Sequence, residues 1–95
     1  MHNYIDNFAH SLLPSEAEQA NYLLDAPQFI QDGPLNCANY LLDRHIDEGN
    51  GNEVCLRTFD TTWTYKDLYE KANQIAHVLV SDFGLKSGNR VLLRS

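Results

Sequence analysis

Cysteine is scarce in this chain of 95 residues, and Cys37 and Cys55 stand in no C-x-x-C or other metal-ligand spacing. Their spacing argues against a structural zinc site, and the apolar residues around both predict buried free thiols. Apolar runs are short as well, because none approaches the roughly 20 residues that a membrane-spanning helix needs. The N-terminal stretch lacks the basic region of a secretory signal peptide. A cytoplasmic protein without a membrane partner is therefore expected.

Basic side chains are also few, since seven lysines and arginines stand against thirteen aspartates and glutamates, for a net charge of −6. Such a chain repels phosphate backbones, which argues against nucleic acid as a partner. The charge is uneven: residues 1–53 carry nine acids and one base (−8), and residues 54–95 carry four acids and six bases (+2). Three readings stay open: ordinary solvated surface, attraction between the two halves, or an acidic half that faces another part of a larger protein.

Signatures of catalysis are missing too. No G-x-x-x-x-G-K-[ST] phosphate loop is present. No Ser/His/Asp or Cys/His set stands at a spacing that would predict a catalytic arrangement. Asp47 and Glu48 are expected to form a solvated helix end rather than an acid/base pair. His45 has no second ligand at helical or strand spacing, so we expect it to be partly buried beside its leucine neighbours. We predict no catalytic, cofactor-binding or metal-binding residue in this chain.

Proline is confined to the N-terminal region, which it divides into short pieces. Apolar residues recur at helical spacing over residues 5–13, with Asn3 as a candidate cap, and Pro14 ends the pattern. A stretch this short and broken cannot form a domain, so residues 1–35 are predicted to be a leader with short helices that lies along one.

Within the leader, Ser15 and Glu18 form an S-x-x-E capping box, in which side chains satisfy free amides at a helix start. The box predicts a second short helix that runs to about Asp25. Residues 26–35 are predicted to be an irregular connector, with Asp32-Gly33 as its turn.

The remaining residues, 36–95, carry longer patterns. Asn36 is a good N-cap for a helix that ends at Gly49, where glycine accepts the left-handed backbone of a helix terminus. Residues 53–59 and 61–64 are two short runs rich in β-branched and aromatic residues, and they predict a β-hairpin.

The longest helical pattern follows the hairpin. Thr64 and Asp67 form a second capping box, and Gly84 is the glycine that ends the helix. Lys66 and Glu70 lie four residues apart on the polar face. The apolar stripe comprises Tyr65, Leu68, Tyr69, Ala72, Ile75, Ala76, Leu79 and Phe83.

A turn over residues 86–89 leads to Arg90–Arg94, which is predicted to be a strand. Its uninterrupted apolar run, Val91 to Leu93, is typical of a strand covered on both faces, as in a parallel sheet. Strand, helix and strand joined by short loops predict a βαβ unit and an α/β fold class. An uncovered apolar strand invites pairing, so we also expect self-association or partial disorder at the C-terminal edge.

Four aromatic side chains lie close together in the sequence: Phe59, Trp63, Tyr65 and Tyr69. They could line a groove, but helix and strand periodicity place most of them in a core. From the residues alone, the chain is an α/β piece without a visible active site.

Residues 36–94 resemble the start of the large domain of AMP-forming acyl-CoA and aryl-CoA ligases, the adenylate-forming superfamily. The resemblance rests on T-Y-x-[ED]-L-x-x-x-[AV]-N-[RQ]-x-A-x-x-L and G-[LV]-x-x-G-[DN]-R-V, preceded by N-x-A. The matching residues are Asn36, Ala38, Thr64, Tyr65, Asp67, Leu68, Ala72, Asn73, Gln74, Ala76, Leu79, Gly84, Leu85, Gly88, Asn89, Arg90 and Val91. The leader, LLPSEAEQANYLLDAPQF, is further similar to benzoate- and 2-aminobenzoate-type CoA ligases.

This resemblance implies that the parent protein joins a carboxylic acid to CoA through an acyl-adenylate, with ATP, Mg²⁺ and CoA as cofactors and an aromatic acid as substrate. The family's phosphate loop, nucleotide-binding motifs, hinge and catalytic lysine come later than the matched segment, so no catalytic position carries over. The resemblance therefore implies that residues 36–95 are the incomplete start of the AMP-binding large domain. Such a fragment would be inactive alone, with the remainder of that domain as its partner.

Two other classes stay open. One is a free-standing acidic interaction or regulatory module without catalysis. The other is a small acidic carrier protein, but carriers of that kind need an Asp-Ser-Leu attachment site, and this sequence has none.

Overall fold

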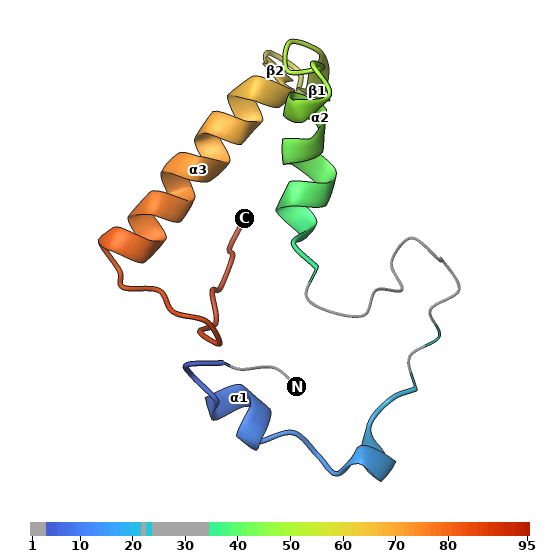
Figure 1. The fold of residues 1–95 in the computed structure, drawn as a ribbon, viewed down its shortest axis with the longest axis vertical. Coiled ribbons are helices and arrows are strands. Elements are labelled where there is room, and N and C mark those ends of the chain that lie inside the picture. Colours follow the sequence, from blue (N-terminus) through green and yellow to red (C-terminus); the bar gives the residue numbers. More distant parts are fainter. Residues whose placement is uncertain (1–3, 22, 24–34) are drawn as a thin grey trace.

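The computed structural model describes residues 4–21, 23 and 35–95 of the chain. The elements follow in this order: α1 (Phe8–Ser11), the 3₁₀ turn η1 (Glu16–Glu18), the π-helical segment η3 (Asn39–Asp43), α2 (Arg44–Asp47), β1 (Val54–Arg57), β2 (Thr62–Thr64) and α3 (Tyr65–Ser81). The ribbon is open, with α2 and α3 diverging from the hairpin (Figure 1). Its radius of gyration is 17.2 Å, whereas a compact chain of this length has about 12 Å.

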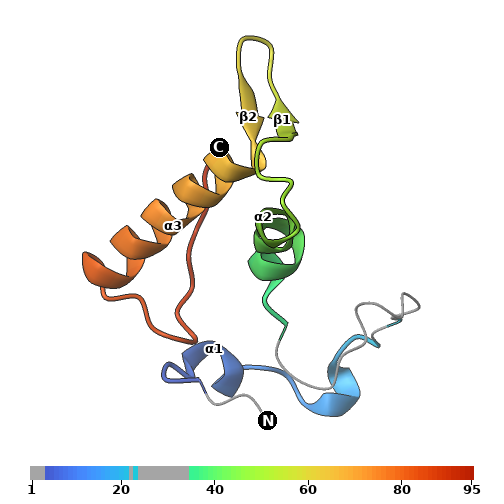
Figure 2. The same ribbon diagram turned by 45° about the horizontal axis from the view of Figure 1, so that its top comes forward.

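The predicted hairpin is confirmed. β1 and β2 pair antiparallel in a two-stranded sheet, with Leu56 opposite Trp63 and an irregularity between Val54 and Leu56. The Thr58 amide donates to the Thr61 carbonyl oxygen at 2.8 Å and closes the loop. Figure 2 shows the hairpin projecting beyond the helices.

The helix predicted after the hairpin is also confirmed, because β2 runs directly into α3. The Asp67 amide donates to Thr64 Oγ1 at 3.1 Å, and the Thr64 amide donates to Asp67 Oδ2 at 2.9 Å. These two bonds are the reciprocal capping box. The helix ends as expected near Gly84, whose φ angle is +65°.

The helix predicted from Asn36 to Gly49 is present, although its middle turn, η3, is π-helical. Asn36 Oδ1 accepts a hydrogen bond from the Asn39 amide at 3.0 Å and so acts as the cap. At the other end Gly49 has a φ angle of +83°, and the Asn50 amide donates to the His45 carbonyl oxygen at 2.8 Å. This is the glycine-based helix end known as the Schellman motif.

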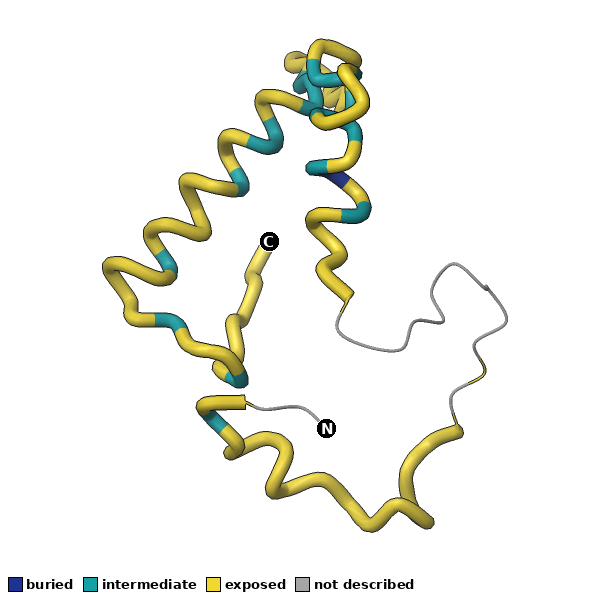
Figure 3. Tube along the Cα trace, viewed as in Figure 1, coloured by how far each residue is buried: buried dark blue, intermediate teal, exposed yellow. Residues whose placement is uncertain are grey.

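Helices α2 and α3 and the hairpin meet at one apex (Figure 1). The Tyr65 amide donates to the Glu53 carbonyl oxygen at 3.0 Å, and the His45 and Tyr65 rings stack with centroids 4.2 Å apart. Leu42, which is 8% exposed, is the buried apolar residue of the described chain. Many of the half-buried residues lie near the hairpin (Figure 3). All the other described residues are exposed or half-buried, so this core is very small.

The leader differs from its prediction in helix length. α1 ends before Pro14 as expected, but it begins at Phe8, and Asn3 lies outside the described residues. The second helix is a single 3₁₀ turn, because Gln19 is already extended. The prediction of a helix to Asp25 is therefore wrong over 19–21 and at Leu23, none of which is helical. Residues 22, 24 and 25, like residues 26–34 of the connector, lie outside the described residues. The few hydrogen bonds of one capped turn, without a packed face, do not offset the conformational entropy that is lost when a helix nucleates.

The strand predicted over Arg90–Arg94 is not formed. The sheet of the described chain contains β1 and β2 alone, and Leu92 is 93% exposed. In both ribbon views the tail after residue 90 runs back in the direction of the hairpin without joining it. A β-strand forms only when its backbone makes hydrogen bonds to a neighbouring strand, and no described strand lies beside the tail. The βαβ prediction fails with it, and the fold is a small mixed α/β arrangement of helices and one antiparallel hairpin.

Two burial predictions also need correction. Both cysteines are free, as predicted, but Cys37 is exposed and Cys55 only half-buried. Phe59 is fully exposed in the loop between the strands, while Trp63 and Tyr65 are half-buried. Periodicity predicts which side chains share a face, but it does not show whether another element packs on that face. In the described part of the chain, nothing packs against the hairpin loop, where Phe59 lies, or against the outer side of the first helical turn, where Cys37 lies.

Candidate functional site

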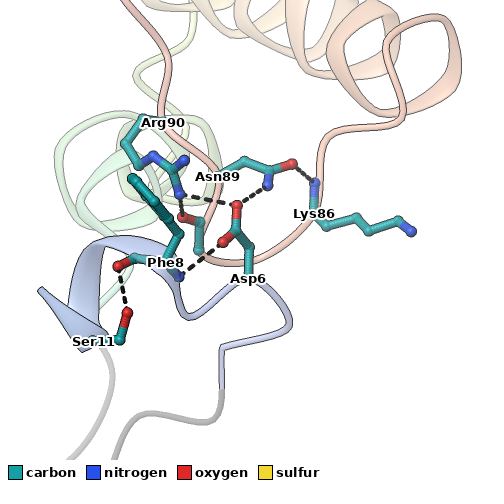
Figure 4. Close-up of polar contacts among 7 residues, drawn as sticks. Asp6, Phe8, Ser11, Lys86, Asn89 and Arg90 are labelled. Carbon is teal, nitrogen blue, oxygen red and sulfur yellow. Dashed lines mark hydrogen bonds and ion pairs between the residues drawn. The ribbon is translucent and has the colours of Figure 1, made fainter.

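The most densely hydrogen-bonded contact between distant parts of the described chain joins two segments. One is the N-terminal segment, residues 4–13, and the other is the glycine turn, residues 86–90 (Figure 4). The turn closes on itself, because the Asn89 amide donates to the Lys86 carbonyl oxygen at 3.0 Å and the Lys86 amide donates to Asn89 Oδ1 at 2.9 Å. The φ angle at Gly88 is +93°, which glycine adopts without strain.

Asp6 connects the two segments. Its Oδ2 atom accepts hydrogen bonds from Asn89 Nδ2 at 2.8 Å and from Arg90 Nη1 at 2.9 Å. Its Oδ1 atom accepts from the Phe8 amide at 3.0 Å, at the start of α1. The amides of Ile5 and Asp6 both donate to the Ser87 carbonyl oxygen, at 3.1 and 3.0 Å. One carboxylate thus holds a helix start and a turn together.

Arg90 is held at more than one point. Nη1 also donates to the Gly88 carbonyl oxygen at 3.1 Å, and the guanidinium carbon lies 5.0 Å from the centre of the Phe8 ring. This distance is within the range of a cation–π contact. Planar, multiply bonded arginine is better suited than lysine to such a fixed position.

The electrostatics keep Asp6 ionised. The hydrogen bond from the Phe8 amide, followed by that from Asn89 and the charge of Arg90, holds the pKa of Asp6 below its ordinary value of 3.8. Partial burial opposes this effect. At neutral pH the group is a charged acceptor, so it is suited to structural pairing rather than to proton transfer.

A hollow of about 400 Å³ lies beside this contact. Its lining comprises Tyr4, Asp6, Ala9, His10, Leu13, Gly88, Asn89 and Arg90. Asp6 and Arg90 bond to each other here instead of presenting free groups to a ligand. The hollow therefore has no charged group left over to fix a small molecule in one orientation.

A second hollow, of about 420 Å³, lies between β2 and the first turns of α3. It is lined by Thr61, Thr62, Trp63, Asp67, Glu70, Lys71 and Gln74. Asp67 is committed to the helix cap, because the Thr64 amide hydrogen bond is the main cause that lowers its pKa. Glu70 lies 4.0 Å from Lys66 Nζ. These partners make the lining a solvated helix face rather than an acid/base site.

The residues weighed as ligands or acids have ordinary surroundings. His45 is half-buried as predicted and stacks on Tyr65. Asp47 and Glu48 are exposed at the end of α2, with Glu48 3.9 Å from Arg44 Nε, which confirms the solvated helix end. Over residues 4–21, 23 and 35–95, no three His, Cys, Asp or Glu side chains gather in a way that could hold a metal ion. None of the helices in that part of the chain is both long and apolar enough to cross a membrane.

Sequence reasoning missed the Asp6 contact, because Asp6 and Arg90 are 84 residues apart. Two signals pointed near it. The uneven charge suggested attraction between the halves, and the Asp6–Arg90 pair is one such contact, at 2.9 Å. The ligase-like motif also marked Gly88, Asn89 and Arg90, without indicating what they touch.

Known proteins similar to this chain are acyl-CoA synthetases. It is 33% identical over 72 residues to acetyl-coenzyme A synthetase of Paraburkholderia phymatum, an alignment that covers 70% of this chain and 11% of that protein. It is 33% identical over 73 residues to the mitochondrial acyl-CoA synthetase short-chain family member 3 of Homo sapiens, covering 70% of this chain and 10% of that protein. Acetyl-coenzyme A synthetase of Pyrobaculum aerophilum is 29% identical over 73 residues, covering 64% of this chain and 11% of that protein.

The chain is a partial homologue of acyl-CoA synthetases. It spans about a tenth of the length of these relatives. No protein-family model matches it, and no solved structure matches it. The relatives support the broad resemblance to acyl-CoA ligases, and they give no support to the finer one to benzoate- and 2-aminobenzoate-type enzymes.

Proposed function

We propose that this chain is an N-terminal structural part of an ATP-dependent carboxylic acid–CoA ligase and is inactive by itself. The observation that carries the proposal is the 33% identity to acetyl-coenzyme A synthetase over 72 residues. In the parent enzyme, ATP, Mg²⁺ and CoA would serve the formation of an acyl-adenylate and then of a thioester. A short-chain acid such as acetate is the substrate that agrees with the names of the relatives. The division into a leader, 1–35, and the start of a large domain, 36–95, and a cytoplasmic location are parts of the same proposal.

The motif residues have scaffold roles in the structure, which supports this assignment. Thr64 caps α3, Gly84 and Gly88 adopt positive φ angles, and Arg90 holds the turn that follows the helix. None of these positions is free to act on a substrate. The motifs therefore favour a structural contribution to a ligase.

The exposed apolar surface supports a partner that covers it. Leu42 is the one buried apolar side chain of the described residues, while large apolar side chains on α3 and the tail are exposed. They are Ile75, Val78 and Val80 on α3, Phe83 just after it, and Val91, Leu92 and Leu93 in the tail. So many exposed large apolar side chains favour a surface that another part of a larger protein covers. We propose that the remainder of the large domain covers it, and that the isolated chain self-associates in its absence.

A segment exchange tests the proposal. The matched segment of the Paraburkholderia phymatum enzyme is replaced by this chain's matched residues, and acetate-dependent ATP–pyrophosphate exchange is measured. We expect the chimera to retain exchange activity. A chimera with the same residues in scrambled order is the control and is expected to be inactive. Equal inactivity of two soluble chimeras, or exchange activity in the isolated chain, would refute the proposal.

A free-standing acidic interaction module is the second candidate, favoured by the charge of −8 over residues 1–53. Asp47, Glu48 and Glu53 of this half are exposed. Such a module should bind a basic protein with an affinity that falls steeply as salt is raised. A scaffold segment should show no such binding when titrated with a lysine-rich peptide in low salt.

A further inference from the structure

The N-terminal segment closes over the glycine turn, and we propose that it is a strap that sets the direction of the tail. In this proposal residues 4–13 lock the turn after α3. The apolar run Val91–Leu93 then leaves the helix along one fixed path. The device is conformational, and it concerns this chain alone, so it holds whether or not the ligase assignment does.

The contacts that fasten the strap are polar and converge on a few atoms. Two successive amides, of Ile5 and Asp6, donate to the one carbonyl oxygen of Ser87. Asp6 Oδ2 accepts from Asn89 and Arg90 at 2.8 and 2.9 Å. Charge-assisted bonds to a carboxylate are stronger than neutral ones. The fastening is therefore directional and specific to this turn.

A glycine makes the close approach feasible. A Cβ atom placed on Gly88 would overlap the Asp6 carbonyl oxygen and would lie 3.0 Å from Tyr4 Cβ. The strap backbone thus occupies the space where any other residue would carry a side chain. Gly84 shares the positive φ angle of Gly88, but a Cβ atom there would meet nothing within 4 Å. The two glycines differ in their neighbours and not in the sign of φ.

The strap acts on the tail through Arg90, the residue directly before Val91. The Arg90 guanidinium is tied to Asp6, to the Gly88 carbonyl oxygen and to the Phe8 ring. Two of these three partners belong to the strap. When the strap is released, Arg90 loses both, and the backbone at Val91 is then free to reorient.

The strap is also built to open. Ile5 and Phe8 remain exposed although they are in the docked segment. Little apolar area therefore holds the strap in place, and segments with few buried contacts open at low free-energy cost. The polar contacts decide whether it is docked, so it can change state without unfolding the apex around Leu42.

The test compares Gly88→Ala with Gly84→Ala in the full chain. Amide hydrogen exchange is read by NMR at Ile5 and Asp6, and the order of residues 91–93 by ¹⁵N relaxation. We expect Gly88→Ala to speed exchange at Ile5 and Asp6 by about tenfold or more, as expected for the loss of several hydrogen bonds, and to lower order in the tail. Gly84→Ala also places alanine at a positive φ angle, but in open space, and we expect it to leave both amides protected.

A second variant, Asp6→Ala, tests the proposal independently in case Gly88→Ala does not fold. Asp6→Ala removes the side-chain fastening without altering the turn, so it should also speed exchange at Ile5, while the ellipticity of α3 stays unchanged. The proposal is overturned if the two glycine variants affect Ile5 and Asp6 equally, or if these amides exchange freely in the unmodified chain. Tail order that stays unchanged after the strap is released would overturn the direction-setting role.

Discussion

The chain contains two capping boxes with very different outcomes. In the leader, the Ser15 amide donates to Glu18 Oε2 at 3.3 Å, and the helix that follows is the three-residue turn η1. After the hairpin, the Thr64 amide donates to Asp67 Oδ2 at 2.9 Å, and the helix that follows is the 17-residue α3. The first box lacks the hydroxyl cap that Thr64 provides, because Ser15 Oγ donates to Glu18 Oε2 at 2.6 Å and the Glu18 amide donates to the Ser15 carbonyl oxygen at 2.9 Å. The capping motif alone therefore does not determine helix length.

The difference lies in packing. Every described residue from Ser15 to Gln19 is exposed, whereas α3 begins with half-buried Tyr65, whose ring stacks on His45. A cap satisfies free amides and fixes where a helix starts. Propagation needs a buried face to offset the entropy of each added residue. The box after the hairpin lies at the apex of the fold, and the leader's box does not.

Removing the packing should have the largest effect. Leu42→Ala opens a cavity at the buried point of the apex, and we expect it to lower the free energy of unfolding by about 2–3 kcal/mol. Leu41, its neighbour of the same type, is 63% exposed, so Leu41→Ala is the matched control, with an expected loss of about 0.5 kcal/mol or less. Urea unfolding followed by ellipticity at the helix band measures both. Equal losses of unfolding free energy in the two variants would show that packing around Leu42 is not what separates the Thr64–Asp67 box from the Ser15–Glu18 box.

Removing the caps should have a smaller and asymmetric effect. Thr64→Ala leaves the Asp67 amide without its acceptor, and we expect a loss of about 1 kcal/mol in the free energy of unfolding. Ser15→Ala deletes the hydroxyl at the matching position of the leader, where it bonds to Glu18 Oε2 and not to a backbone amide. Since no long helix depends on it, helix content and stability should not change measurably. A loss after Ser15→Ala as large as that after Thr64→Ala would contradict the distinction drawn here.

Local patterns accounted for much of this fold. The Asn36 cap, the hairpin, the Thr64–Asp67 box and the glycine ends at Gly49 and Gly84 depend on residues within a few positions of one another. Backbone sterics and capping hydrogen bonds act over that range, so sequence spacing is sufficient to predict them.

The features that failed depend on distant partners. Arg90–Arg94 has strand composition, but a strand needs a neighbour, and the described chain offers none beside it. Cys37 lies in an apolar pattern without an element packed over it. The Asp6 fastening joins residues more than 80 positions apart, and no local spacing predicts such a pair. The candidate site was therefore found only in three dimensions.

Acid should weaken the Thr64–Asp67 box and the contacts of the strap. Protonation of Glu18 in the Ser15–Glu18 box should not change the helix content measurably. Hydrogen bonds lower the pKa of Asp6, Glu18 and Asp67 below their ordinary values of 3.8, 4.5 and 3.8. A lowered folded-state pKa stabilises the structure above the unfolded value, and this stabilisation is lost as pH falls through the folded value. Helix content and Ile5 amide protection should thus be constant near neutral pH and fall in strong acid.

An acid titration of the Asp67→Asn variant separates the contributions. Its helix content should depend less on pH than that of the unmodified chain, while the strap still opens as Asp6 is protonated. The charged and titratable side chains beside Asp6 are Arg90, which bonds to it, and His10, which lines the same hollow. Helix loss in acid that is identical in the variant and the unmodified chain would show that the Thr64–Asp67 box does not carry the pH dependence.

The smallest expected effect concerns the polar face of α3. Lys66 Nζ lies 4.0 Å from Glu70 Oε1, and the two side chains are 63% and 58% exposed. Exposed pairs four residues apart contribute about 0.2–0.5 kcal/mol, and less when the base precedes the acid as it does here. A double-mutant cycle with Lys66→Met and Glu70→Gln should therefore give a coupling energy within that range that vanishes in high salt. A coupling well above about 1 kcal/mol would show that this face is shielded from solvent, and packing on the far side of α3 would then also sustain the helix.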